Sequence, residues 1–128
     1  MRALLDTHTF LWWLLDVPNL SVECRQILDD GANEILLSVV SGYELAYKAH
    51  VGRLTLPEAP DAYVRSRLAA NGFGALSIEL SHALRAASLP VIHRDPFDRL
   101  LVAQAQLEGL PIMTADPAIA QYDVDVIW

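Results

Sequence analysis

The segment HRDPFDRLLVAQA at residues 93–105 carries two aspartates one helical turn apart, where an amphipathic helix is predicted to begin. Further acids stand at comparable points: Asp6 ends an apolar run, Glu44 lies on a helical stretch, and Asp116 follows another apolar run. Carboxylates that converge repel one another and raise one another's pKa unless a cation lies among them. Oxygen-only ligands favour Mg²⁺, with Mn²⁺ a plausible substitute.

Such an ion lowers the pKa of a bound water and stabilises charge on a phosphoryl group, which predicts hydrolysis of a phosphodiester. Three small polar residues lie beside the acids in the sequence. Thr7 follows the first acid, Ser38 precedes the helix of the second, and Thr114 comes two residues before the last. Each could orient a water or a carboxylate, or could serve as a cap or turn residue. We interpret Ser38 as a cap and leave Thr114 open.

Each acid also has a purely structural explanation. Glu44 could pair with Lys48 at the i,i+4 spacing of a helix. Four aspartates could cap helix N-termini, two of them followed by proline at the first helical position: Asp6, Asp95, Asp98 and Asp116. Capping does not require the acids to converge, whereas a metal site does.

Short apolar runs alternate with longer amphipathic ones along the chain. The short runs predict strands at residues 3–5, 34–37, 75–78, 111–114 and 124–128. The amphipathic runs predict helices at residues 7–15, 22–30, 39–50, 62–71, 82–87 and 99–108. Expected N-caps and C-terminal glycines are Ser21, Ser38, Ser81, Gly31, Gly72 and Gly109.

This alternation is typical of a three-layer α/β fold, with a mostly parallel five-stranded sheet and helices on both faces. Ligands bind such sheets at the carboxyl ends of the strands. Asp6 and Asp116 each follow a predicted strand, and Asp98 begins a helix after another apolar segment. The topology alone therefore predicts that these three acids approach the same edge of the sheet.

Length and composition predict one domain over residues 1–128. Hydrophobic residues make up 53% of the chain and charged residues 20%, as expected of a chain that folds. The apolar stretch at residues 9–15 is too short to cross a bilayer, so we expect no membrane segment. The single cysteine, Cys24, excludes an intrachain disulfide and suits a reducing compartment, so the cytoplasm is the expected location.

The net charge of −7 argues against a generic basic nucleic-acid binder. It allows a metal-dependent one, because the four acids of the predicted pocket would supply more than half of this excess. Eight of the nine basic residues are arginines, which bind phosphate in a bidentate manner. Arg94 and Arg99 flank the acidic segment, although either could be a solvated surface residue.

Four segments together resemble the PIN-domain ribonucleases, in particular the VapC-like toxins of bacterial toxin–antitoxin pairs. They are LLDTHTFLWWL at 4–14, LSVVSGYELAYK at 37–48, HRDPFDRLLVAQA at 93–105 and PIMTADPAI at 111–119. The likeness runs over nearly the whole chain, in order and at family spacing. The third segment is the most specific of the four.

The resemblance implies a Mg²⁺ pocket formed by Asp6, Glu44, Asp98 and Asp116, with no departure from the four-acid pattern. Asp98 matches the family's third acid, and Asp95 is then an auxiliary residue that shapes the turn. Thr7 and Thr114 are further auxiliary residues. Arg94, Arg99 and Lys48 are candidate phosphate contacts, with Arg99 equally able to orient an aspartate. The resemblance also implies an endoribonuclease that acts on RNA as a toxin, forms a homodimer, and is silenced by a cognate antitoxin.

The segment around Trp12 and Trp13 is apolar on almost every side. Adjacent helical residues point about 100° apart, so we expect one of the two to meet a partner, either a second copy or an antitoxin. Plain packing across two layers is the alternative. His8 and His93 lie near the acids without a metal-ligand spacing, and we interpret both as satisfied polar residues.

Two other functions remain open. A phosphohydrolase could use Asp6 as a covalent nucleophile, but His8 stands where the second aspartate of a DxDxT motif is needed. A non-catalytic α/β interaction module of the receiver type needs paired acids after the first strand, where only Asp6 is present. Both patterns fit less well than a metal-dependent nuclease.

Overall fold

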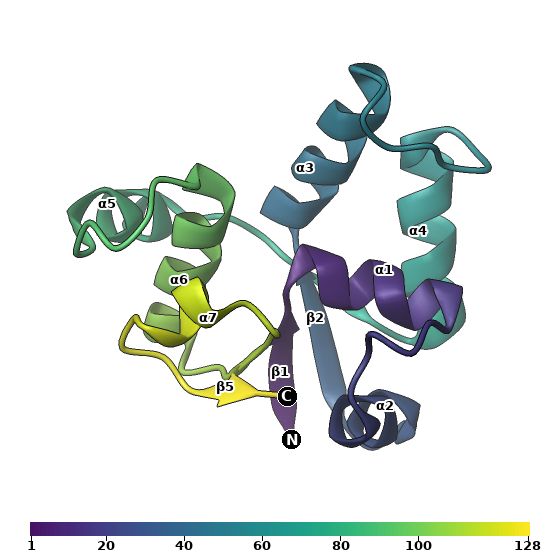
Figure 1. Ribbon diagram of the computed structural model, residues 1–128, viewed down its shortest axis with the longest axis horizontal. Helices are drawn as coiled ribbons and strands as arrows, with labels where there is room; N and C mark the ends of the chain where they lie inside the picture. The colour runs from purple at the N-terminus through teal and green to yellow at the C-terminus, as the bar shows by residue number, and fades with distance from the viewer.

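All five strands of the central sheet run parallel, in the order β3-β2-β1-β4-β5. The computed structural model describes residues 1–128 (Figure 1). The strands are β1 (Arg2–Leu5), β2 (Glu34–Ser38), β3 (Gly74–Leu76), β4 (Ile112–Met113) and β5 (Val126–Ile127). The helices are α1 (Thr7–Leu15), α2 (Val22–Asp29), α3 (Val39–His50), α4 (Pro60–Asn71), α5 (Leu80–Ser88), α6 (Pro96–Glu108) and α7 (Pro117–Ala120). The predicted α/β class is confirmed.

Alternate residues of the strands pack into two separate cores. Leu4 pairs with Ile112 in the sheet, and both contact the helices α5, α6 and α7 on one face. Leu5 pairs with Met113, and both contact α1, α2 and α4 on the other face (Figure 1). Burying each leucine contributes about 1.5–3 kcal/mol relative to exposure. The apolar runs are continuous because both faces of the sheet are covered.

The topological switch point of the sheet lies between β1 and β4. From β1 the chain adds β2 and β3 on one side, and it then returns to add β4 and β5 on the other side. In open α/β sheets, a ligand crevice lies outside the carboxyl ends of the strands at such a switch point. The chain leaves β1 directly into Asp6, and it leaves β4 directly into Thr114. The fold therefore places two of the predicted site residues on the two sides of this crevice.

Most of the predicted helix ends are confirmed. Ser21 and Ser38 accept hydrogen bonds from the backbone N–H groups of Cys24 and Val40, at 3.1 and 3.0 Å. Gly72 and Gly109 end α4 and α6 with φ angles of +67° and +66°, where a side chain would be strained. Of these residues only Ser38, the last residue of β2, lies at the carboxyl edge of the sheet.

Several predicted boundaries are wrong. Ser81 lies inside α5, which begins at Leu80, two residues before the predicted start, because the side chain of His82 satisfies the Glu79 N–H. Gly31 adopts no positive φ, since α2 ends at Asp29 and its C-cap, Asp30, has extended backbone. The acidic segment enters its helix three residues before the predicted start, at Pro96.

The short helix α7 was not predicted from the sequence. It has four residues and begins with the Asp116–Pro117 pair, which is typical of an N-cap followed by the first helical position. None of the seven helices has the length and apolar character that a bilayer crossing requires.

Candidate active site

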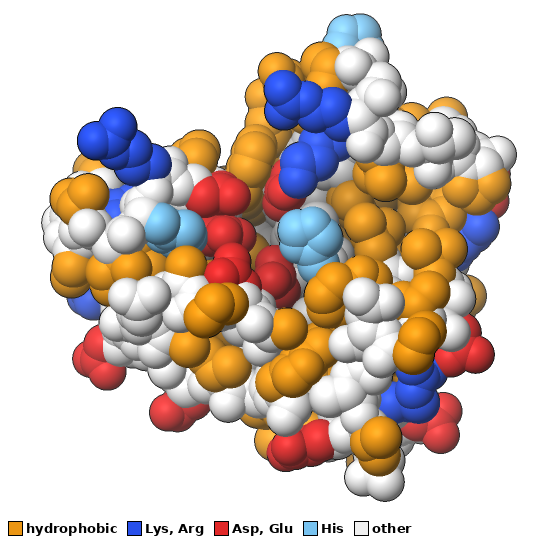
Figure 2. Space-filling view, in the orientation of Figure 1, with side chains coloured by type: hydrophobic (Ala, Val, Ile, Leu, Met, Phe, Trp, Pro, Cys, Tyr) orange, Lys and Arg blue, Asp and Glu red, His pale blue; other side chains and the backbone are white.

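An acidic hollow lies at the carboxyl ends of β1 and β4. Figure 2 shows Asp and Glu side chains gathered there, with histidine side chains on either side. Asp116 raises the pKa of Asp6, and both of these acids raise the pKa of Asp98. A cavity of about 300 Å³ beside them is lined in part by Asp6, His8 and Asp116. Three acids from three distant segments thus meet at one place, as the topology predicts.

Asp6 is held by the end of β4 and does not cap α1. Its N–H donates to the Met113 carbonyl at 3.1 Å, and the Thr114 hydroxyl donates to its Oδ2 atom at 2.7 Å. The side chain makes no capping hydrogen bond. Burial raises the pKa of Asp6, against the opposing effects of the Thr114 bond and the nearby His8. Asp6 is therefore a buried acid without a paired cation.

Asp98 lies in the first turn of α6, with its side chain 14% exposed. Burial is the main cause that raises its pKa to about 7, followed by the charges of Asp95 and Asp6. The hydrogen bond with His93 opposes these effects. An acid with this pKa is only partly ionised near neutral pH, so a cation in the hollow would favour its charged form.

Asp95 and Asp116 are both N-caps, in agreement with the structural explanation. Asp95 Oδ1 accepts from the N–H groups of Phe97 and Asp98, at 2.9 and 3.2 Å. Asp116 Oδ1 accepts from the Ala118 N–H at 2.8 Å. Capping uses one oxygen of each carboxylate, and both charges still reach Asp98. The two roles are therefore compatible in the same side chain.

Glu44 projects from α3 and is only 5% exposed. It is the one predicted pocket acid that forms an ion pair with a lysine or an arginine. Lys48, one turn later, donates to its Oε2 atom. The Thr7 hydroxyl lies 2.9 Å from Glu44 Oε1 and 2.8 Å from Ser41 Oγ. Since a carboxylate can only accept, Thr7 donates to Glu44 and Ser41 donates to Thr7. The predicted i,i+4 pair exists, within a network that also fixes the carboxylate.

No three His, Cys, Asp or Glu side chains lie close enough together to enclose a metal ion. The donor set nevertheless suits Mg²⁺, which keeps several waters and is held by one or two carboxylates. The converging acids, Asp6, Asp98 and Asp116, offer oxygen ligands and an excess of negative charge. These residues fit a hydrated divalent ion and do not fit a closed, fully protein-ligated site.

The three predicted phosphate contacts differ in their surroundings. Arg94 is exposed and makes no hydrogen bond or ion pair within the chain. Lys48 is occupied by Glu44. The Arg99 guanidinium donates to the carbonyls of Ala86, Leu89 and Pro90, at 2.8 to 3.0 Å. Arg99 therefore satisfies the C-terminus of α5, which argues against a phosphate contact there.

Two contributors to the hollow were missed in the sequence. Ser41 lies one turn before Glu44 on the same helix face, so its i,i+3 spacing was the available signal. Tyr122 Oη lies 2.8 Å from His93 Nδ1, and 29 residues of sequence separate the two. No local pattern signals that contact. The interpretation of His93 as a satisfied polar residue is confirmed, since both of its ring nitrogens are hydrogen-bonded.

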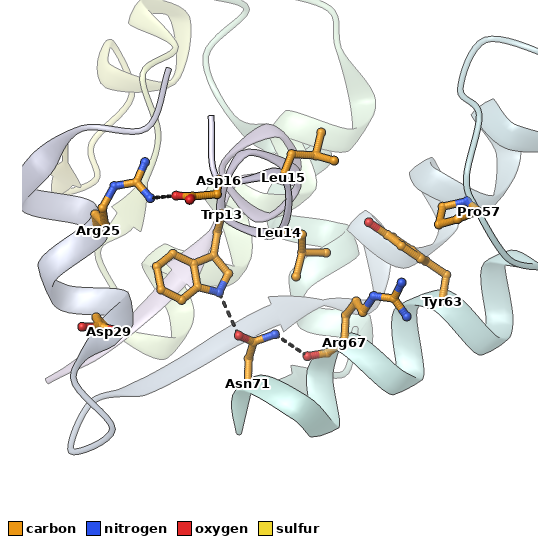
Figure 3. A pocket seen from close by; sticks show the side chains of 10 residues that line it. All are labelled: Trp13, Leu14, Leu15, Asp16, Arg25, Asp29, Pro57, Tyr63, Arg67 and Asn71. Carbon is orange, nitrogen blue, oxygen red and sulfur yellow. Dashed lines mark hydrogen bonds and ion pairs between the residues drawn. The ribbon is translucent and has the colours of Figure 1, made fainter. Parts of the chain in front are cut away.

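A second hollow, with a volume of about 660 Å³, lies away from Asp6, Asp98 and Asp116. Figure 3 shows residues of α1, α2 and α4 around it, with Trp13 donating from Nε1 to Asn71 at 2.9 Å. Trp12 packs against Trp128, with ring centroids 5.7 Å apart. Both tryptophans are half-buried against the same core. The packing agrees with the alternative of contact within the chain, and the expectation that one of them meets a partner stays a prediction.

Comparison with known proteins yields one family and several similar folds. The model of the PIN domain family matches residues 3–125. Ribonuclease VapC16 of Mycobacterium tuberculosis is 40% identical over 60 residues, which cover 47% of this chain and 43% of that protein. The chain thus matches less than half the length of this curated relative.

Two solved structures share the fold over almost the whole chain. VapBC2 from Rickettsia felis, bound to a DNA fragment from their promoter, gives a TM-score of 0.72 at 14% identity, covering 99% of this chain and 98% of that one. A toxin–antitoxin complex from Klebsiella pneumoniae gives 0.64 at 23% identity, covering 98% and 96%. At these identities the likeness establishes the fold alone. Since the family model matches residues 3–125, nearly the whole chain, this chain belongs to the PIN domain family.

Proposed function

We propose that this protein is a Mg²⁺-dependent endoribonuclease, with Mn²⁺ as a substitute ion, and that it acts as the toxin of a toxin–antitoxin pair. The proposal rests on membership of the PIN domain family and on the ribonuclease relative. One observation carries it: Asp6, Asp98 and Asp116 converge, and none of the three is paired with a lysine or an arginine of the chain. Such an arrangement is costly for a fold that binds no ion.

A bound divalent ion would act as a Lewis acid on the phosphodiester and would lower the pKa of the attacking water. The side chains of Asp6 and Asp98, with Asp116, would hold that ion. Thr114 keeps Asp6 in place through a hydrogen bond of 2.7 Å. Thr7 and Ser41 orient Glu44 at the other side of the hollow. The free guanidinium of Arg94 is suited to the RNA phosphate.

Cleavage of a structured RNA pool by the purified protein tests this function. Cleavage is expected with Mg²⁺ or Mn²⁺ and is expected to stop when a chelator is added. Asp6→Asn should remove it, whereas Asp125→Asn should not, because Asp125 is exposed at the opposite end of the sheet. Undiminished cleavage by Asp6→Asn, or in the presence of chelator, would sink the proposal.

The proposed partners are a cognate antitoxin and a second copy of the chain. The relevant support is that a similar fold occurs in the toxin–antitoxin complex from Klebsiella pneumoniae. Co-expression with the product of the neighbouring reading frame should yield a complex that no longer cleaves RNA. Light scattering on the isolated chain measures whether it is a dimer. A neighbouring product that neither binds nor inhibits the chain contradicts the toxin role while leaving the nuclease role intact.

A further inference from the structure

A chain of hydrogen bonds runs from the C-terminus of α5 to Asp98. The Arg99 guanidinium binds the carbonyls at the end of α5 and lies 3.2 Å from Tyr122 Oη through its NH1 group. Tyr122 Oη lies 2.8 Å from His93 Nδ1, and His93 Nε2 lies 3.2 Å from Asp98 Oδ2. Tyr122, in the middle of this chain of hydrogen bonds, is 5% exposed and belongs to the hydrophobic core, so the core fixes its position.

The donors and acceptors of this chain are assigned for an ionised Asp98 and a neutral His93. The Asp98 carboxylate can only accept, so His93 Nε2 donates to it, and Nδ1 of the neutral imidazole then accepts from the Tyr122 hydroxyl. Arginine has no acceptor, so Arg99 NH1 donates to the same hydroxyl oxygen. A neutral imidazole that accepts at Nδ1 carries its proton at Nε2, and Nε2 faces a carboxylate oxygen that accepts. Every bond in the chain then has one donor and one acceptor.

The two carboxylate oxygens of Asp98 differ in their hydrogen bonds. Oδ2 accepts from His93, whereas Oδ1 receives no hydrogen bond from any other residue. We propose that His93 is a positioning residue: held as the Nε2–H tautomer by Tyr122, it fixes the Asp98 carboxylate and leaves Oδ1 as the atom that binds the divalent ion. This inference rests on the proposed metal-dependent function. It also gives Arg99 a role, through Tyr122, different from a phosphate contact.

The same molecule contains a control for the tautomer. His82 is 1% exposed, accepts from the Glu79 N–H at Nδ1 over 2.9 Å, and lies 2.8 Å from Glu108 Oε1 through Nε2. A backbone N–H can only donate, so His82 must also be the Nε2–H tautomer. It shares no partner with Asp98. Any change in His93 that spares His82 therefore arises in the chain through Tyr122.

Nitrogen–proton correlation spectra of the metal-free protein at about pH 8, where Asp98 is mostly ionised, measure both tautomers. Wild type should show Nε2–H for His93 and for His82. Tyr122→Phe, which keeps the ring and removes the hydroxyl, should give a mixture of tautomers at His93 alone. Tyr63→Phe is the matched control, because Tyr63 is also buried and its hydroxyl makes no hydrogen bond within the chain. An Nδ1–H proton on His93 in wild type overturns the proposal.

The effect on the metal site is measured by Mn²⁺ titration followed by calorimetry, without RNA. Loss of a residue that orients a ligand typically weakens metal binding by about 10- to 100-fold. Tyr122→Phe and His93→Ala should fall in that range, while Tyr63→Phe should bind as wild type does. His93→Gln, whose amide can donate to Asp98, should recover most of the affinity. If Tyr122→Phe does not fold, the His93→Ala and His93→Gln pair decides the matter.

The outcomes separate this inference from the proposed function. Wild type that binds no Mn²⁺ contradicts the metal-dependent function, and the proposed role of His93 fails with it. Wild type that binds Mn²⁺, together with His93→Ala of equal affinity, leaves the function standing and overturns the positioning role. Weaker binding by His93→Ala that His93→Gln does not recover assigns the loss to packing and also overturns it.

Discussion

Asp6 and Glu44 are both 5% exposed, yet their surroundings differ completely. Glu44 has its own cation, Lys48, and a hydroxyl donor, Thr7. Asp6 has one hydroxyl donor and faces Asp116 and Asp98, which are also acidic and therefore repel it when ionised. Equal burial therefore gives one acid that the chain neutralises and one that it leaves uncompensated.

The contrast shows where a ligand is required. On the α3 side of the hollow, Lys48 balances the charge of Glu44, so that side needs no added cation. The side formed by β1, α6 and α7 concentrates acids and raises the pKa of Asp98 to about 7. Burial of a charge without a partner is unfavourable, so this second side is stabilised only by protons or by a cation. The predictions below test that difference.

Replacing one acid on each side should give unequal losses of RNA cleavage. Asp98→Asn removes a charge that no residue neutralises, and losing several kcal/mol of metal-assisted stabilisation corresponds to a decrease of at least about 100-fold. Glu44→Gln removes a charge that Lys48 already neutralises, so a decrease of about 10-fold is expected. Initial rates on the same RNA measure both. Equal losses would show that the two sides contribute alike.

The stability of the metal-free protein should fall as the pH rises, with Asp98 as a main cause. The folded pKa of Asp98, about 7, exceeds its ordinary value of 3.8, so the native state binds more protons between these values. This contribution is fully present below the lower value and is lost as the pH passes the higher one. Asp98→Asn should therefore stabilise the protein at about pH 8, by at most about 4 kcal/mol.

Urea unfolding with chelator at about pH 5 and about pH 8 measures this effect. The gain from Asp98→Asn should be smaller at the lower pH, and Mn²⁺ should stabilise wild type at the higher one. Asp125→Asn serves as the control, since its side chain is exposed and makes no ion pair. A loss of stability in Asp98→Asn at about pH 8 contradicts the comparison.

Lys48→Met should convert the α3 side into a second uncompensated side. It leaves Glu44 buried without its cation, which costs about 1–2 kcal/mol because Lys48 is one-third exposed. Stabilisation by Mn²⁺ should then exceed that of wild type. Arg65→Met is the control: it breaks an exposed i,i+4 pair with Asp61, where no measurable change is expected. Equal Mn²⁺ effects in Lys48→Met and wild type would count against this view of Glu44.

Much of the fold could be predicted because the local signals agreed with the tertiary structure. The limits of α1 and α3 match residue for residue, since Ser38 caps one helix and apolar periodicity marks both. The predicted start of α6 was wrong because either of two aspartates could cap the helix. Asp95 is the N-cap, since its side chain accepts from the N–H of Asp98. The strands β4 and β5 are shorter than predicted, although Pro111, Thr114 and Asp125 each form one backbone hydrogen bond to a neighbouring strand.

The meeting of Asp6, Asp98 and Asp116 followed from topology, because strand ends in a parallel sheet share an edge. The hydrogen-bond partners did not follow from it. Arg99 stands beside the acids in the sequence but points to the end of α5, since buried carbonyls there need donors. Tyr122 reaches His93 only through the turn after α7. Such contacts depend on packing between helices, which residue spacing does not encode.

Arg94→Ala should have the smallest effect of the changes considered, and it isolates substrate binding from the acids. Arg94 is exposed and unpaired, so its loss removes a phosphate contact without exposing a buried partner. A single phosphate contact lowers RNA affinity modestly and reduces the slope of log affinity against log salt by about 0.7 to 1. Binding of RNA by the Asp6→Asn protein, with and without the Arg94 change, measures this slope without cleavage.

Arg85→Ala is the matched control, since Arg85 is also exposed and its side chain bonds only to Gln106. If Arg85→Ala lowers the slope as much as Arg94→Ala does, the contact is diffuse attraction to the surface. A slope that only Arg94→Ala lowers places the RNA backbone on the α6 side of the hollow, where the chain leaves its acids without a cation.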